Sequence, residues 1–188
     1  MSRTGQRRRT TKETSIEVDI DLDGTGDTDI STGIPFYDHM LDQIGRHGGF
    51  DLRVHATGDL HIDTHHTVED VAIALGEAFA EALGDKAGVR RFASGRYPLD
   101  EALIDVALDL SGRPWVEWHV PMPESLPLGD PAFDPQLAEH AVASFATAAN
   151  ITLHVELVRG RKVHHIIEAT VKGLARTLRD AGRGDHAG

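Results

Sequence analysis

The sequence contains the pattern His-His-x-x-Glu twice, as His65, His66 and Glu69 and again as His164, His165 and Glu168. Each copy opens a segment with apolar residues at three- and four-residue spacing over about four turns, which is typical of an amphipathic helix. A repeat of this kind indicates a duplicated domain, and duplication constrains the fold more strongly than any local preference.

Further segments repeat in the same order. Residues 15–22 and 102–110 both alternate apolar and polar, as half-buried strands do, at an offset of 88 residues. Residues 38–54 align with 139–155 at an offset of 101, and the His-His segments align at an offset of 99. The offset grows because the second half has an additional proline-rich loop at 119–136. Each half is predicted to run strand, turn, strand, helix, strand, strand, helix.

Two such halves would each leave a sheet face and its helices uncovered. We therefore predict an α+β fold in which the helices pack between two four-stranded mixed sheets, with two helices in each half. The predicted parts are one catalytic domain over 1–188, repeat halves at 9–97 and 98–181, and flexible tails at 1–8 and 182–188.

The composition narrows the possible functions. No cysteine is present, so disulfides, iron–sulfur clusters and thiolate zinc sites are excluded. The net charge of -11 disfavours a nucleic-acid partner, although residues 3–12 are basic, and we expect them to form a solvated or subunit-contacting arm. Neither a secretory signal nor an apolar run of roughly 18 residues is present, so we expect a cytoplasmic protein without a membrane partner.

The histidine doublets indicate metal binding. Side chains three or four residues apart share a helix face, so either histidine of a doublet can reach the same ion as the glutamate. Adjacent residues point about 100° apart around the axis, so a doublet suits two ions, one for each histidine. His39 and His140, at equivalent positions in the two halves, add one imidazole each. We predict two symmetric sites of three histidines and one glutamate, suited to Mn²⁺, Fe²⁺, Zn²⁺ or Ni²⁺.

Two readings stay open for the acidic residues around the first doublet. Asp63 and Asp70 are candidate partners for the ligand imidazoles. Asp63 or Thr64 equally fits the first position of the helix. The remaining histidines are interpreted as ordinary packed or solvated residues: His55, His61, His119, His154 and His186.

Several longer motifs carry a family resemblance, namely GIPFYDHMLDQ, HIDTHHTVED, PLDEAL, DLSGRP and HHIIEATVKGLARTL. From Arg9 to Ala181 the chain resembles the imidazoleglycerol-phosphate dehydratases of histidine biosynthesis. The resemblance implies a ribosomal protein S5 domain 2-like fold in each half and a lyase that converts D-erythro-imidazole glycerol phosphate to imidazole acetol phosphate. It also implies a homo-oligomer of twenty-four subunits, with two manganese ions (Mn²⁺) in each active site at subunit contacts and the substrate ring bound as imidazolate.

The resemblance also assigns roles to individual residues. The family's metal ligands fall on the eight residues that the duplication selects: His39, His65, His66, Glu69, His140, His164, His165 and Glu168. Its catalytic glutamate falls on Glu13, in TKET. Its substrate contacts fall on Gln43, Arg91, Arg113 and Lys172, of which the three cationic side chains would bind the phosphate.

Two features depart from the family pattern. Lys162 stands where the family has asparagine, and residues 182–188 do not match the family's serine-rich, phosphate-covering tail. We expect either a lower phosphate affinity or a replacement of that contact by Arg179 or Arg183. An alternative function is a catalytically impaired metal-binding paralogue of the same shell-forming fold. The presence of Glu13 favours the enzyme, because metal storage needs no base at that position.

Overall fold

Alternating apolar residues build the centre of the first sheet. In strand β2 (Thr14–Asp21), Ile16, Val18 and Ile20 are buried and the residues between them are more exposed. This period of two matches the pleat of a strand that is covered on one face. The structure, a computed structural model, describes residues 2–184 of the chain.

The first half contains four strands and two helices. They are β1 (Thr4–Thr10), β2, β3 (Thr28–Ser31), α1 (Pro35–Gly48), β4 (Asp51–Gly58) and α2 (His65–Leu83). The strand order in the sheet is β1-β2-β4-β3, and only the β3–β4 pair is parallel.

The second half repeats this topology. Its elements are β5 (Phe92–Leu99), β6 (Ala102–Asp109), β7 (Trp115–His119), α3 (Gln136–Ala148), β8 (Thr152–Arg159) and α4 (Val163–Gly182). The strand order is β5-β6-β8-β7, and the β7–β8 pair is again parallel. The predicted fold class, two similar α+β halves with a mixed four-stranded sheet each, is confirmed.

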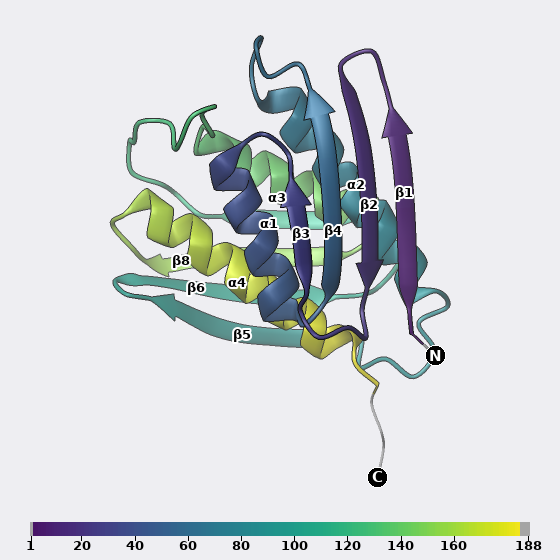
Figure 1. The fold of residues 1–188 in the computed structure, drawn as a ribbon. Coiled ribbons are helices and arrows are strands. Elements are labelled where there is room, and N and C mark those ends of the chain that lie inside the picture. The colour runs from purple at the N-terminus through teal and green to yellow at the C-terminus, as the bar shows by residue number, and fades with distance from the viewer. Residues whose placement is uncertain (1, 185–188) are drawn as a thin grey trace.

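The four helices lie between the two sheets (Figure 1). Helices α1 and α2 cover the first sheet, α3 and α4 contact the second, and the α1–α4 and α2–α3 contacts join the halves. Phe79 of α2 lies between Phe50 and Phe145, with ring centroids 6.1 and 5.8 Å away. The two halves therefore share one hydrophobic core.

Glycines allow the close packing of this core. A Cβ atom on Gly5 of β1 would collide with the backbone carbonyl of Ala78 in α2. A Cβ atom on Gly76 of α2 would collide with the carbonyl of Phe145 in α3. Because collisions with backbone cannot be relieved by a side-chain rotation, both contacts require glycine.

The order of elements differs from the prediction. In each half three strands precede the first helix and a single strand lies between the helices. Strands β3 and β7 are short, and β1 has an exposed, mostly polar outer face, so they carry little apolar periodicity. The additional loop of the second half, residues 120–135, replaces the short link 32–34 between β3 and α1.

The predicted boundaries also need correction. Residues 4–8 belong to strand β1 and not to a flexible tail, because they pair with residues 17–21 of β2, and Arg7 and Arg8 also pair with carboxylates of α2 and β2. The boundary predicted at 97/98 falls inside β5, all of which pairs with β6 in the second sheet. At the other end α4 reaches Gly182, and the predicted tail residues 185–188 lie outside the described residues.

Within residues 2–184, none of the helices combines the length and apolar character needed to cross a lipid bilayer.

Candidate metal centre

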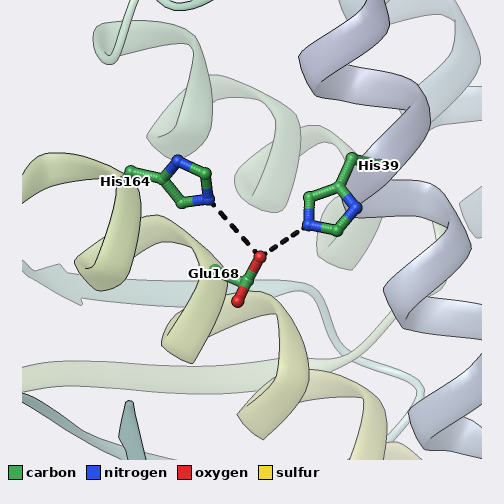
Figure 2. A group of neighbouring side chains, drawn as sticks. All are labelled: His39, His164 and Glu168. Atoms are coloured by element: carbon green, nitrogen blue, oxygen red, sulfur yellow. Dashed lines mark hydrogen bonds and ion pairs between the residues drawn. The ribbon is translucent and has the colours of Figure 1, made fainter. Parts of the chain in front are cut away.

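Helices α1 and α4 bring together the first group of predicted ligands, His39, His164 and Glu168 (Figure 2). Oε1 of Glu168 lies 2.6 Å from Nε2 of His39 and 3.5 Å from Nε2 of His164. His164 and Glu168 are four residues apart on α4, so they share a helix face. His39 comes from the other half of the molecule.

Helices α2 and α3 bring together a second group, His65, Glu69 and His140. Nε2 of His65 lies 3.5 Å from Oε2 of Glu69, and Nε2 of His140 lies 3.4 Å from Oε1 of the same carboxylate. The two imidazole centroids are 4.7 Å apart. This group is the duplicate of the first, with the roles of the two halves exchanged.

Both groups fit a divalent cation. In each, one ligand atom from every residue lies within 4.8 Å of the others, so the three atoms surround a common point. Two imidazole nitrogens and one carboxylate oxygen suit borderline ions such as Mn²⁺, Fe²⁺ or Zn²⁺. The Nε2 atom of His140 is buried and has no hydrogen-bond partner among the described residues, which is expected of an atom reserved for another ligand.

The two groups differ in their electrostatic surroundings. Lys172 lies one helical turn after Glu168, and its Nζ is 3.0 Å from Oε2 of that carboxylate. Burial raises the pKa of Glu168, but the hydrogen bonds from Lys172 and His39 outweigh it and hold the pKa at about 2. Glu69 is more exposed, with 35% of its side chain accessible against 11% for Glu168. The carboxylate of the α1–α4 group is therefore already neutralised by a lysine.

The prediction of three histidines in each site is not met within one chain. His66 and His165, the second members of the doublets, lie on other faces of their helices, with ring centroids 6.1 and 6.0 Å from their neighbours. Nδ1 of His66 lies 2.9 Å from Oδ2 of Asp59, and Nδ1 of His165 lies 2.5 Å from Oε1 of Glu101. Side chains of adjacent residues point in different directions around a helix, so the two histidines of each doublet face two different sites.

Asp59 and Glu101 contact the doublet histidines, and the sequence did not lead us to expect either contact. Asp63 instead accepts a hydrogen bond from the backbone N–H of His65, so it serves the start of α2. Asp70 accepts a hydrogen bond from Thr14 Oγ1. Glu101 aligns with Glu13 in the duplication, and this equivalence is the signal that could have found it.

Comparison with known proteins agrees with this geometry. A family model described as imidazoleglycerol-phosphate dehydratase matches residues 32–178. The chain is 55% identical over 185 residues to the imidazoleglycerol-phosphate dehydratase of Streptomyces coelicolor, covering 98% of this chain and 93% of that protein. The chain belongs to the imidazoleglycerol-phosphate dehydratase family. It is thus a hydro-lyase of histidine biosynthesis.

Solved structures of this family have the same fold. The crystal structure of imidazoleglycerol-phosphate dehydratase from Staphylococcus aureus has a TM-score of 0.86 at 32% identity, covering 97% of this chain and 99% of that chain. The crystal structure of the Pyrococcus furiosus protein has a TM-score of 0.82 at 36% identity, covering 96% of this chain and 95% of that chain.

The substrate contacts expected from the dehydratase family are divided between two regions. Lys172 lies beside Glu168, and Gln43 Oε1 lies 3.1 Å from Nε2 of His47 on α1. Arg91 instead pairs with Asp109, at 2.6 Å, and Arg113 is exposed in the loop after β6. Within residues 2–184, no hydrogen bond or ion pair joins either arginine to the two ligand groups.

Glu13 and Lys162 both lie beside a doublet. Glu13 is exposed in the β1–β2 turn, and its charge adds to that of Asp59, the principal cause of the raised pKa of His66. Lys162 is exposed directly before α4, and its backbone N–H donates to Glu101.

A cavity of about 900 Å³ opens beside His140. The additional loop of the second half forms one wall, including Met122 and Glu124, and α3 forms another. Thr64, directly before α2, donates a hydrogen bond to the carbonyl of Ala132 in the same loop. The insertion is thereby fixed beside the α2–α3 group.

Proposed function

We propose that this chain dehydrates D-erythro-imidazole glycerol phosphate to imidazole acetol phosphate at a site that holds two Mn²⁺ ions. The observation that carries the proposal is the pair of duplicated groups, His39–His164–Glu168 and His65–His140–Glu69. A metal store would need ligands but no exposed carboxylate beside them, and Glu13 is such a carboxylate.

The active site is proposed to form between subunits of a cytoplasmic homo-oligomer with twenty-four copies. Each ligand group within one chain has two imidazoles, whereas the second histidine of each doublet faces away from both groups. His66 and His165 would then complete the groups of neighbouring copies. The separation of Arg91 and Arg113 from Lys172 supports the same arrangement, because subunit contacts would be needed to gather them.

When bound, the two ions would supply Lewis acidity that favours the imidazolate form of the substrate ring. The residues of the chain bind and orient the rest of the molecule. Arg91, Arg113 and Lys172 would bind the phosphate by charge-assisted hydrogen bonds, and Gln43 would contact the substrate. Glu13 would take the proton from C2 of the side chain as the C3 hydroxyl leaves.

The test is the Mn²⁺-dependent formation of imidazole acetol phosphate by the purified protein. Glu13→Gln is expected to lower kcat by roughly 10²- to 10⁴-fold, the usual contribution of a general base, while the manganese content stays unchanged. Glu156→Gln, the same chemical change at an exposed position of β8, is the matched control and should retain activity.

Two results would overturn the proposal. One is a parent protein that takes up Mn²⁺ but forms no product, which would leave the metal-binding paralogue. The other is full turnover after exhaustive removal of divalent ions.

A further inference from the structure

His165 is the outward-facing histidine of α4, the doublet member that points away from the ligand groups, and its Nδ1 contacts a carboxylate that has three hydrogen-bond partners. Glu101 lies in the β5–β6 turn, and its Oε1 is 2.5 Å from Nδ1 of His165. Its other oxygen, Oε2, accepts the backbone N–H groups of Arg161 at 2.7 Å and Lys162 at 3.1 Å. Oε2 is thus committed to backbone, and only Oε1 can serve the imidazole.

His66, the outward-facing histidine of α2, contacts a carboxylate that has fewer hydrogen-bond partners. Oδ2 of Asp59, directly after β4, lies 2.9 Å from Nδ1 of His66. The second oxygen, Oδ1, is buried and accepts no hydrogen bond from any described residue. Asp59 is therefore free to rotate its carboxyl group without breaking another contact.

The duplication shows that these two carboxylates are not equivalent. Strand register places Glu101 at the position of Glu13, directly before β6 and β2 respectively. In the same register, β8 has one additional residue at Val158, so Arg161 stands at the position of Asp59. The Nδ1 atom of the doublet histidine is thus served by Asp59 in the first half and by Glu101, the counterpart of Glu13, in the second, where Asp100 also lies 3.8 Å from Nε2 of His165.

We propose that Asp59 and Glu101 are positioning residues that fix His66 and His165 in the tautomer with Nε2 free for a cation, and that Asp59 thereby leaves Glu13 unengaged. An ionised carboxylate only accepts hydrogen bonds, so Nδ1 of each ring carries the proton and the lone pair lies on Nε2. This inference rests on the proposed function, because the free Nε2 atoms are useful only to a bound ion. It explains why a duplicated chain offers only one catalytic carboxylate.

The two positioning residues should respond differently to amide substitution. In Glu101→Gln the amide oxygen stays with the two backbone N–H groups, so the NH₂ group faces His165 and donates to Nδ1. The proton of His165 then moves to Nε2, which can no longer bind a metal. In Asp59→Asn the amide can turn its oxygen toward His66, and the tautomer is preserved.

When Asp59 is removed, Glu13 should take its place as the hydrogen-bond acceptor of His66. Glu101 reaches the imidazole of its own half from the equivalent turn, so Glu13 can reach Nδ1 of His66 once Asp59 is absent. Asp59→Ala should then retain most of its manganese affinity and lose kcat, because Glu13 is diverted from the substrate. The double variant Asp59→Ala, Glu13→Gln has no such replacement.

The experiment measures Mn²⁺ affinity by equilibrium dialysis and the thermal unfolding of the metal-free protein, for the parent and five variants. Glu101→Gln and the double variant should bind Mn²⁺ about 10- to 100-fold more weakly, the usual effect of removing a partner of a metal-bound histidine. Asp59→Asn, Asp59→Ala and Glu13→Gln should each stay within about 3-fold of the parent, well below that range.

Different outcomes would overturn different claims. Parental affinity in Glu101→Gln with unchanged unfolding would remove the positioning role of Glu101. Should that variant fail to fold, the comparison of Asp59→Ala with the double variant still tests the proposal. Equal Mn²⁺ affinities of these two variants would show that Glu13 does not replace Asp59 at His66. A parent protein without Mn²⁺ uptake or turnover would instead contradict the proposed function.

Discussion

Nε2 of His39 lies 2.6 Å from Oε1 of Glu168, although 129 positions separate the two residues in the chain. The contact exists because α1 of the first half packs on α4 of the second. The same crossing of α2 and α3 puts His140 3.4 Å from Glu69. Each ligand group therefore depends on the packing of both halves.

Removing either carboxylate should abolish one class of manganese site and leave the other. We expect Glu168→Gln and Glu69→Gln each to lose about half of the bound Mn²⁺, since a neutral amide oxygen attracts a divalent cation much less than a carboxylate does. Elemental analysis of the dialysed proteins measures this, with His61→Ala, an exposed histidine outside both groups, as the control. Unchanged metal content in both glutamine variants would refute the ligand assignment.

Lys172 should make the two sites unequal. Its ammonium group is 3.0 Å from Glu168, and the equivalent position of α2 is occupied by the apolar Ile73. Lys172→Met should therefore strengthen Mn²⁺ binding to the α1–α4 group by about 10-fold, because a neighbouring positive charge opposes a cation. The same change should raise the KM for the phosphorylated substrate.

Titration of the metal-free proteins with Mn²⁺ measures these affinities. Lys172→Arg keeps the charge and should bind Mn²⁺ like the parent. Equal affinities of the parent and Lys172→Met would show that the lysine has no influence on the ion.

The sequence predicted which residues share a helix face better than it predicted their hydrogen-bond partners. The two His-His-x-x-Glu patterns lie on strongly periodic helices, so spacing alone was enough to show which residues share a face. The contacts of Asp59 and Glu101 depend on how a loop and a hairpin turn approach a helix. No local periodicity encodes such an approach, and Glu101 lies 64 positions from His165.

The misplaced boundaries have a related cause. Strand β1 contains three consecutive arginines, Arg7 to Arg9, which suggested a solvated arm. In the fold these side chains reach carboxylates on α2 and β2, and Gly5 lets the strand lie directly on α2. Charge in a strand is thus stabilised by partners that are distant in sequence, which a local reading cannot include.

The metal-free protein should lose stability in acid. The pKa of Glu101 is lowered to about 2 by the backbone N–H of Arg161, His165 and the N–H of Lys162, and the pKa of Glu168 is also about 2. Both values lie below the ordinary 4.5, so these carboxylates stabilise the fold above pH 4.5, and the contribution is lost as the pH falls toward 2. The thermal midpoint should decline steadily over that interval.

Glu101→Gln should make this decline shallower, because the variant has one fewer carboxylate that takes up a proton when the protein unfolds in acid. Scanning calorimetry between about pH 6 and pH 2 measures the slope, on either side of the ordinary carboxyl range. Glu156→Gln removes an exposed carboxylate and should leave the slope as in the parent. An identical slope in Glu101→Gln would contradict the assigned role of its hydrogen bonds.

The aromatic contact between the halves should control one ligand group more than the other. Phe79 is fully buried between Phe50 and Phe145, so Phe79→Ala should lower the free energy of unfolding by about 3–5 kcal/mol. Urea unfolding measures this change, and Phe79→Leu, which keeps most of the volume, should cost about 1.5 kcal/mol or less.

The same substitution loosens the packing of α2 on α3, and these helices carry His65, Glu69 and His140. Mn²⁺ affinity of Phe79→Ala should therefore fall at this group while the α1–α4 group binds as before. Titrations in the Glu168→Gln and Glu69→Gln backgrounds separate the two groups. An equal loss at both groups would mean that the cavity disturbs the whole helical layer rather than the contact that Phe79 makes.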